Sequence, residues 1–388
     1  MTSRFKLGVA VFAALSITMA ACGDDEAADT TTPAVTEAPV DTEAPVETDA
    51  PVETDAPVET DAPVEVSSLD FNGDGKVVFG IAAAGPRDDG AYYQALVDKV
   101  EEFSAENGFE APIVVDNIAA EDAATQLANL AEQGVDVVTV GASEIADPLA
   151  DLTEQYPDIF WYCNCGAGYP QTPGLAQSQD DSSEISYTAG YATGLLLQES
   201  GGDAAAFIGC CDLNFEKEAY LAYELGLKAV DPAFTMKMIP TGSFPYDFDN
   251  TAGATEAFNA AVAEGIDAVY PYLGGAHEPV VKLANEAGVI TMSAGSSKAC
   301  DRDDLDYQIQ VRFDAGDYLD TILAEILDGS FKEGDIRVFR VGVDTQPGAQ
   351  ICDATAEQQT AMDDLYAKIA AGEFGAQFGE IKGKAYSG

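Results

Sequence analysis

The side chains best suited to bind a small molecule stand directly after short apolar runs, where strands of a sheet would end. These candidates are Asp88, Asp89, Phe215, Gly274, Gly275 and His277. Carboxylates accept hydrogen bonds from hydroxyl or amino groups, aromatic rings stack on planar ligands, and glycine lets a backbone approach a ligand closely. The pattern therefore indicates a binding site. Structural alternatives stay open: a helix N-cap for Asp89, turn chemistry for the two glycines, and a cap or surface position for the histidine.

Sequence motifs for catalysis are absent. The chain has no glycine-rich phosphate loop, no recognisable Ser/His/Asp motif and no zinc signature, and His277 is its single histidine. We therefore expect no enzymatic activity, no cofactor and no metal; a hydrolase with clustered carboxylates is the catalytic alternative. Asp70, Asn72 and Asp74 resemble the first half of an EF-hand loop, but Ile81 stands at the twelfth position, where the loop requires glutamate. We interpret that segment as a polar turn.

The chain is strongly acidic. It carries 68 acidic and 18 basic residues, a formal net charge of −50, most of it after Ser67. Such a field disfavours nucleic acids and multiply anionic ligands, whereas a neutral or cationic small molecule suits it better. Solubility in saline surroundings is an alternative explanation of the acidity. No apolar run after Ala21 is long enough to span a bilayer.

Residues 1–21 have the composition of a secretory signal peptide. Two basic residues precede an apolar run, and small residues then lead to Cys22. Residues 19–22 are similar to the lipobox of bacterial lipoproteins, which implies that Cys22 carries a lipid and anchors the protein at the extracytoplasmic face of the cell membrane. An ordinary signal peptide is the alternative. Residues 22–68 include an acidic, proline-rich repeat, for which we expect a disordered linker.

Six cysteines follow the linker, and an even number outside the cytoplasm predicts disulfides. They are Cys163, Cys165, Cys210, Cys211, Cys300 and Cys352. A metal site is the competing interpretation, but neither the first pair nor the adjacent second pair has the spacing of a zinc site. Among the possible connectivities we favour a bond between Cys300 and Cys352.

Short apolar runs alternate with helical patterns after residue 76. The runs cover residues 77–83, 113–116, 135–140, 159–163, 204–208, 268–272 and 289–293. They are rich in Val, Ile and Phe and apolar on both faces, as buried parallel strands are. Apolar residues at helical spacing lie between them, as over residues 89–107, where we assign Tyr93 to the core. The pattern predicts an α/β fold with parallel sheets.

An internal similarity divides the chain. Residues 132–138 are matched by 263–269: in both copies a helical pattern ends at glycine, aspartate follows two residues later, and a strand begins. We infer two similar α/β lobes facing a cleft, although such junctions also arise by chance. Ligands of open α/β sheets bind where strands end, so the loops after the strands should line that cleft.

Several segments resemble the basic membrane protein family of substrate-binding lipoproteins. They are residues 156–160, 186–194, 222–232, 242–247 and 272–276, and the likeness covers nearly all of 76–388. The family has the type I periplasmic-binding-protein fold and delivers ligands, often purine nucleosides, to ATP-driven importers. The resemblance implies two three-layer lobes joined by a hinge within residues 69–388. Lobe 1 would be mainly 76–183 with a crossover segment near 307–345, and lobe 2 mainly 203–300 with the C-terminal helix.

The resemblance also implies further site residues. Phe244 and Asp247 match a family stretch, and Tyr92 could supply the ring that stacks on a base, although an ordinary helix position is equally open. Ser293 stands where family members usually carry a carboxylate pair for sugar hydroxyls. At the end of the predicted strand 159–163, residues 163–166 stand where an acidic residue often follows the strand in the family. These departures weaken the expectation that the ligand is a nucleoside and leave the expected fold unchanged.

Together these observations predict a lipid-anchored, monomeric substrate-binding lipoprotein of an ABC importer. It would capture a small neutral ligand, with a purine nucleoside as the leading candidate, between its two lobes. Its partners would be that ligand, the permease subunits and the membrane, but no nucleic acid. A sugar-binding protein of the same fold and a surface receptor for a sensor kinase are the alternatives.

Overall fold

The structure is a computed structural model that describes residues 68–90, 92–166, 168–210, 213–242 and 247–387. They belong to one compact unit, residues 63–388. The predicted α/β class with parallel sheets is confirmed, because two sheets of six and four strands alternate with helices along the chain.

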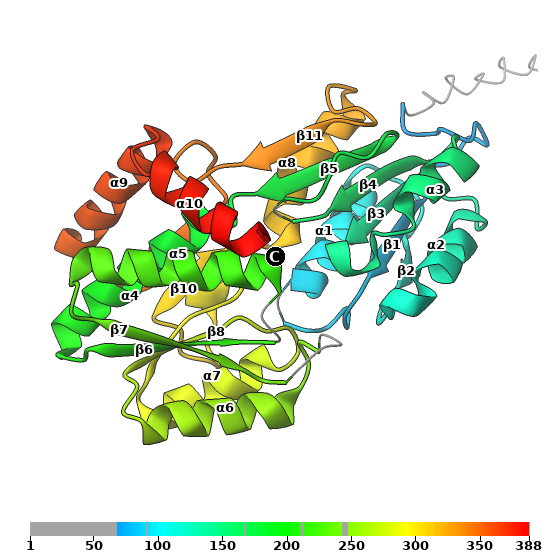
Figure 1. Cartoon of the computed structure of the whole chain (residues 1–388). Coiled ribbons are helices and arrows are strands. Elements are labelled where there is room, and N and C mark those ends of the chain that lie inside the picture. Colours follow the sequence, from blue (N-terminus) through cyan, green and yellow to red (C-terminus); the bar gives the residue numbers. More distant parts are fainter. Residues whose placement is uncertain (1–67, 91, 167, 211–212, 243–246, 388) are drawn as a thin grey trace, which may run out of the picture. The chain divides into compact units, whose positions relative to one another are not determined.

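The six-stranded sheet is parallel throughout, with the order β11-β5-β4-β3-β1-β2 (Figure 1). Its strands are β1 (Phe79–Ala83), β2 (Ile113–Val115), β3 (Val137–Gly141), β4 (Phe160–Asn164), β5 (Leu175–Asp180) and β11 (Ile336–Phe339). Every residue of β1, β3 and β4 is buried, which is why these runs are apolar on both faces.

Helices cover both faces of this sheet and complete lobe 1. On one face, α1 (Tyr92–Glu106) and α8 (Ala315–Leu327) pack around Phe79 and Ile81. On the other, α2 (Ala123–Ala131) and α3 (Leu149–Gln155) bury Val138 and Trp161. Elsewhere along the described chain there are three short 3-10 helices, η1 (Ala120–Asp122) and η2 (Ser143–Ile145) before β4 and η3 (Ala299–Asp301) after β9.

Lobe 2 repeats the three-layer plan around the four-stranded parallel sheet, whose order is β7-β6-β8-β9. Its strands are β6 (Ala204–Gly209), β7 (Thr235–Pro240), β8 (Ala268–Pro271) and β9 (Ile290–Thr291). Figure 1 shows α4 (Ser182–Ser200) and α5 (Asn214–Val230) on one face, with α6 (Thr251–Ala263) and α7 (His277–Ala287) on the other. The last helices, α9 (Ala356–Ala370) and α10 (Gly375–Tyr386), pack on α4 and α5.

The internal similarity of the sequence has a structural counterpart. Asp136 comes just before β3, and its carboxylate accepts a hydrogen bond from the backbone N–H of Val78 (2.9 Å). Asp267 comes just before β8 and accepts in the same way from Asp203 (2.9 Å). Each aspartate therefore ties the start of its own strand to the start of the neighbouring strand, β1 or β6, in equivalent places of the two lobes.

The described chain passes between the lobes three times, after β5, after β9 and after β11. The two later passages include β10 (Ile309–Arg312) and β12 (Gly348–Ile351), which pair antiparallel, unlike the strands of the two main sheets. Charged groups join the first and third passages: Arg340 Nε donates to both carboxylate oxygens of Glu184 (2.8 and 2.9 Å). Lys382 Nζ donates to Asp181, the N-cap residue of α4 (2.7 Å).

Helices α4 and α5 cross at unusually close range. A Cβ atom added to Gly190 would lie 1.9 Å from the carbonyl oxygen of Tyr223, and one added to Gly226 would lie 2.0 Å from the carbonyl oxygen of Tyr187. Only glycine leaves room for two backbones at this distance. The crossing is the central contact of lobe 2, since it buries Tyr187 and Tyr223 in the main core.

The predicted bond between Cys300 and Cys352 is confirmed; it spans 52 residues of sequence. Cys163 and Cys165 form a second disulfide with each other, and Cys210 is also disulfide-bonded. Cys211 and Cys22 lie outside the described residues.

Two further expectations were a polar turn at residues 70–75 and no apolar run long enough to span a membrane after Ala21. The Asp70 carboxylate accepts hydrogen bonds from the backbone N–H groups of Gly73 (2.8 Å), Asp74 and Gly75 (both 3.0 Å), as a polar turn requires. Within the described residues no helix is both long and apolar enough to cross a membrane.

Candidate functional site

A cavity of about 150 Å³ lies where the strands of both lobes end. From lobe 1 it is lined by the start of α1, the segment after β3, and the ends of β4 and β5; from lobe 2, by the start of α5 and the loop after β8. This is the edge at which parallel sheets place their ligands, because the loops that leave the strands converge there.

Aromatic rings form much of the cavity wall. On the lobe 2 side Phe248 stacks on Phe215 (ring centroids 6.2 Å apart) and Phe215 tilts against Tyr272 (6.4 Å). Tyr272 in turn stacks on Phe313 (5.7 Å), which follows β10 in a passage between the lobes. On the lobe 1 side, a further ring pair comes from adjacent residues at the start of α1. We call the rings of Phe248, Phe215, Tyr272 and Phe313 the aromatic wall.

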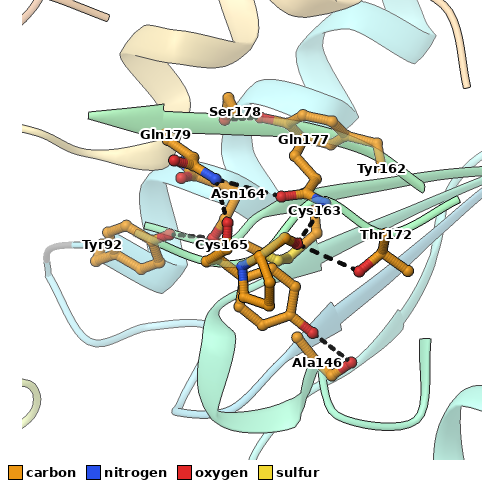
Figure 2. The surroundings of a disulfide bond; sticks show 12 residues. Tyr92, Ala146, Tyr162, Cys163, Asn164, Cys165, Thr172, Gln177, Ser178 and Gln179 are labelled. Atoms are coloured by element: carbon orange, nitrogen blue, oxygen red, sulfur yellow. Dashed lines mark hydrogen bonds between the residues drawn. A yellow bond between two sulfur atoms is a disulfide. The ribbon is translucent and has the colours of Figure 1, made fainter. Parts of the chain in front are cut away.

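The lobe 1 pair is Tyr92 and Tyr93, which meet edge to face at 5.3 Å. Tyr93 was assigned to the core from its helical spacing, and that assignment is wrong, because its half-buried ring lines the cavity. The first turn of α1 lies at the cavity, so two consecutive residues reach it. Tyr92 also donates its hydroxyl to the backbone oxygen of Asn164 (3.1 Å), as Figure 2 shows.

Three carboxylates line the cavity. The Asp89 carboxylate accepts from the backbone N–H groups of Tyr93 (3.2 Å) and Gln94 (3.0 Å), so it satisfies N–H groups in the first turn of α1 from a position before the N-cap. Burial raises the pKa of Glu144. Burial, followed by the charges of Asp181 and Glu218, raises the pKa of Asp180 to about 7.

Two polar atoms at the cavity are buried and have no hydrogen-bond partner in the described part of the chain: Glu144 Oε2 and Asn164 Nδ2. Asn164 is 2% exposed and lies between Cys163 and Cys165, whose disulfide holds the end of β4 (Figure 2). Buried polar groups without partners are costly, and native structures keep few of them. Both atoms are therefore available to a ligand, one as an acceptor and the other as a donor.

The described lining contains no Lys, Arg or His side chain. Among all described residues, no group of three or more His, Cys, Asp or Glu side chains is arranged to hold a metal ion.

Four of the residues predicted from the sequence line this cavity: Asp89, Tyr92, Phe215 and Gly274. Gly275 is next to it and donates its backbone N–H to Asp249 (2.5 Å). A Cβ at either glycine would lie 2.9 Å from that carboxylate, so close backbone packing already accounts for both. Phe244 lies outside the described residues.

Four other candidates are not among the lining residues. Asp88 and Asp247 are exposed, and Ser293 is buried, where its Oγ accepts from the backbone N–H of Val311 (2.9 Å). His277 is buried, with Nδ1 2.7 Å from the carbonyl oxygen of Pro271. Burial lowers its pKa to about 4, so the ring is neutral at physiological pH.

Several lining residues were missed from the sequence. Glu144 lies in η2, just after β3, and Asp180 is the last residue of β5, so both obey the rule that strand ends carry the site. Phe248 and Phe313 follow no predicted strand, and no sequence signal pointed to them.

Comparison with known proteins gives the chain its family. A family model described as the PnrA-like substrate-binding protein of ABC transporters matches residues 76–304. The chain is similar to an ABC transporter solute-binding protein from Conexibacter woesei, at 20% identity and a TM-score of 0.58, over 76% of this chain and 97% of the other. It is also similar to an ABC transporter solute-binding protein from Aeropyrum pernix, at 14% identity and a TM-score of 0.64, over 76% of this chain and 92% of the other.

A transcriptional activator of the comK gene from Bacillus halodurans is also similar, at 14% identity and a TM-score of 0.58, over 75% of this chain and 96% of the other. At such identities these structures show the fold alone. No curated protein sequence matches the chain significantly. The family model covers more than half of the sequence, and the fold agrees with it. The chain therefore belongs to the family of PnrA-like substrate-binding proteins of ABC transporters.

Proposed function

We propose that this protein is the membrane-anchored substrate-binding lipoprotein of an ABC importer and that it captures a small ligand, most readily a purine nucleoside, between its lobes. The observation that carries the proposal is the cavity at the strand ends, with aromatic rings contributed by both lobes. A planar base between Tyr92 on one side and Phe215 on the other would bury both of its faces.

The polar groups of the cavity suit a ligand with both donors and acceptors. Glu144 Oε2 can accept from an N–H or O–H group of the ligand, and Asn164 Nδ2 can donate to a ligand oxygen or ring nitrogen. Closure of two lobes around the ligand would then create a surface that the permease recognises. In this arrangement the protein binds and delivers its ligand as a monomer and performs no chemistry on it.

The membrane anchor is inferred from the sequence around Cys22, which the structure does not describe. If Cys22 carries a lipid, the Cys22→Ala variant should leave the membrane fraction while the unmodified chain stays there. An unchanged membrane fraction in Cys22→Ala cells would contradict the anchor and leave the binding function untouched.

A sugar is the second candidate ligand, because aromatic rings beside carboxylates also suit pyranose rings, which stack their apolar face and offer hydroxyl donors. A receptor that presents its ligand to a sensor kinase would use the same cavity. A permease and an ATPase encoded beside this protein would favour the importer, and an adjacent histidine kinase would favour the receptor.

Calorimetric titration of the purified protein, stripped of carried-over ligand by unfolding and refolding, tests the ligand class. Inosine, guanosine, adenosine and uridine should be titrated in turn. Saturable binding of a purine nucleoside at micromolar or lower concentration, without turnover, is the expected result. No heat with any of the four, from protein whose circular dichroism is native, would contradict the nucleoside and bring sugars forward.

A further inference from the structure

Carboxyl groups line the cavity without a cationic partner in the described lining. Glu144 places a buried carboxylate oxygen at the cavity without a hydrogen-bond partner among the described residues, and Asp180, a second carboxyl, also lines it. The described lining offers no Lys, Arg or His to neutralise either group. A buried carboxylate left in this state is unfavourable, because burial removes its hydration and nothing replaces it.

Glu144 lines the cavity together with the tyrosine pair on α1. Burial raises the pKa of the Tyr92 and Tyr93 hydroxyls, and the negative charge of Glu144 is the next largest cause for both. Glu144, these two rings and the aromatic wall of Phe248, Phe215, Tyr272 and Phe313 line the same cavity.

Aromatic faces and an unpaired carboxylate attract the same kind of partner. A ring presents negative charge on its face and binds a cation within about 6 Å of its centroid, most strongly where water is excluded. The carboxylate adds a charge-assisted hydrogen bond or an ion pair. The net charge of −50 acts in the same direction at longer range.

We propose that the physiological ligand is an organic cation, whose positive charge pairs with Glu144 while its apolar or planar part packs on the aromatic rings of the cavity. This inference rests on the proposed binding function and narrows its ligand class. A neutral ligand can also hydrogen-bond to Glu144, but it would leave the carboxylate either charged and unpaired or protonated. A cation stabilises the ionised form and offsets the cost of its burial.

Two matched ligand pairs separate charge from shape. The first is adenosine and the cationic N1-methyladenosine; the second is 3,3-dimethylbutan-1-ol and its positively charged isostere choline. Calorimetry at neutral pH should show each cation binding roughly 10- to 100-fold more tightly than its neutral partner, which corresponds to a hydrogen bond or ion pair to a buried charged group.

Glu144→Gln tests the assignment to one carboxylate. Glutamine keeps the size and the hydrogen-bonding oxygen but removes the charge, so the variant should lose most of the preference for the cation while it still binds the neutral member of a pair. Glu121→Gln is the matched control, because Glu121 is exposed in η1 and does not line the cavity. Thermal unfolding of both variants establishes that they are folded.

Each outcome decides one proposal or the other. Adenosine that binds at least as tightly as N1-methyladenosine would overturn the inference while keeping the nucleoside function. Choline that binds selectively while neither purine binds would support the inference and contradict the nucleoside. No saturable binding by either cation, or a cation preference that Glu144→Gln leaves unchanged, would overturn the inference.

Discussion

The close crossing of α4 and α5 gives a quantitative prediction for Gly190→Ala. The added Cβ would lie 1.9 Å from the carbonyl oxygen of Tyr223, whereas real Cβ atoms essentially never come within 3.0 Å of another heavy atom. The helices must therefore separate by about 1 Å. Because the obstacle is backbone, no side-chain rotation relieves it.

The expected loss of stability follows from two opposing effects. Overpacking of a core costs about 1–3 kcal/mol, and the upper end applies here because two helices must shift. Alanine in place of a helical glycine regains up to about 1 kcal/mol. We expect Gly190→Ala to lower the free energy of unfolding by about 2 kcal/mol, a large part of the ~5–15 kcal/mol of a typical protein.

The chain supplies a matched control in α10. A Cβ added to Gly383 meets no atom within 4 Å, so Gly383→Ala has only the gain in helix propensity and should raise the free energy of unfolding by up to about 1 kcal/mol. Urea titrations followed by far-ultraviolet circular dichroism would measure both variants. Equal stability of the two variants would refute the close-packing argument.

Two further predictions concern covalent and ionisable groups. The double variant Cys300→Ala/Cys352→Ala removes a disulfide that closes a loop of 52 residues. Chain entropy predicts a loss of roughly 4 kcal/mol in the free energy of unfolding. A loss below about 1 kcal/mol in urea titrations would contradict this. Burial raises the pKa of Asp180 from 3.8 to about 7, so the folded state binds a proton at this carboxyl more tightly than the unfolded state does. The contribution of Asp180 to the free energy of unfolding therefore falls as the pH rises from about 4 to 7. Asp180→Asn should therefore flatten stability over that range, and an unchanged slope in urea titrations at several pH values would contradict the raised pKa.

Much of the fold could be predicted because its determinants are local. Residues 137–140 and 160–163 are apolar at nearly every position since β3 and β4 are buried on both faces, and that composition is visible in the sequence. The internal similarity was also informative, because Asp136 and Asp267 make the same tie between neighbouring strands. The antiparallel pair of β10 and β12 was missed, since its partners come from separate crossings between the lobes.

The site was harder to predict because it depends on how distant segments meet. Asp89 and Phe215 were found from their place after a strand, and Tyr92 from a family resemblance. Phe313 lies beyond the end of β10, in a segment whose position is fixed only when the lobes assemble, so nothing local distinguishes it from a core residue. Glu144 would have been found by applying the strand-end rule to β3 as well as to β1 and β8.

The central claim is that one small ligand contacts both lobes at the aromatic cavity. Calorimetric dissociation constants for the tightest-binding ligand, measured on the unmodified protein, Tyr92→Ala and Phe215→Ala, test it most directly. Each substitution removes a ring from a different lobe and should weaken binding at least tenfold, or about 1.4 kcal/mol, whereas Phe71→Ala, 41% exposed and outside the cavity, should not. Unchanged affinity in either Tyr92→Ala or Phe215→Ala would show that the ligand does not lie between the lobes.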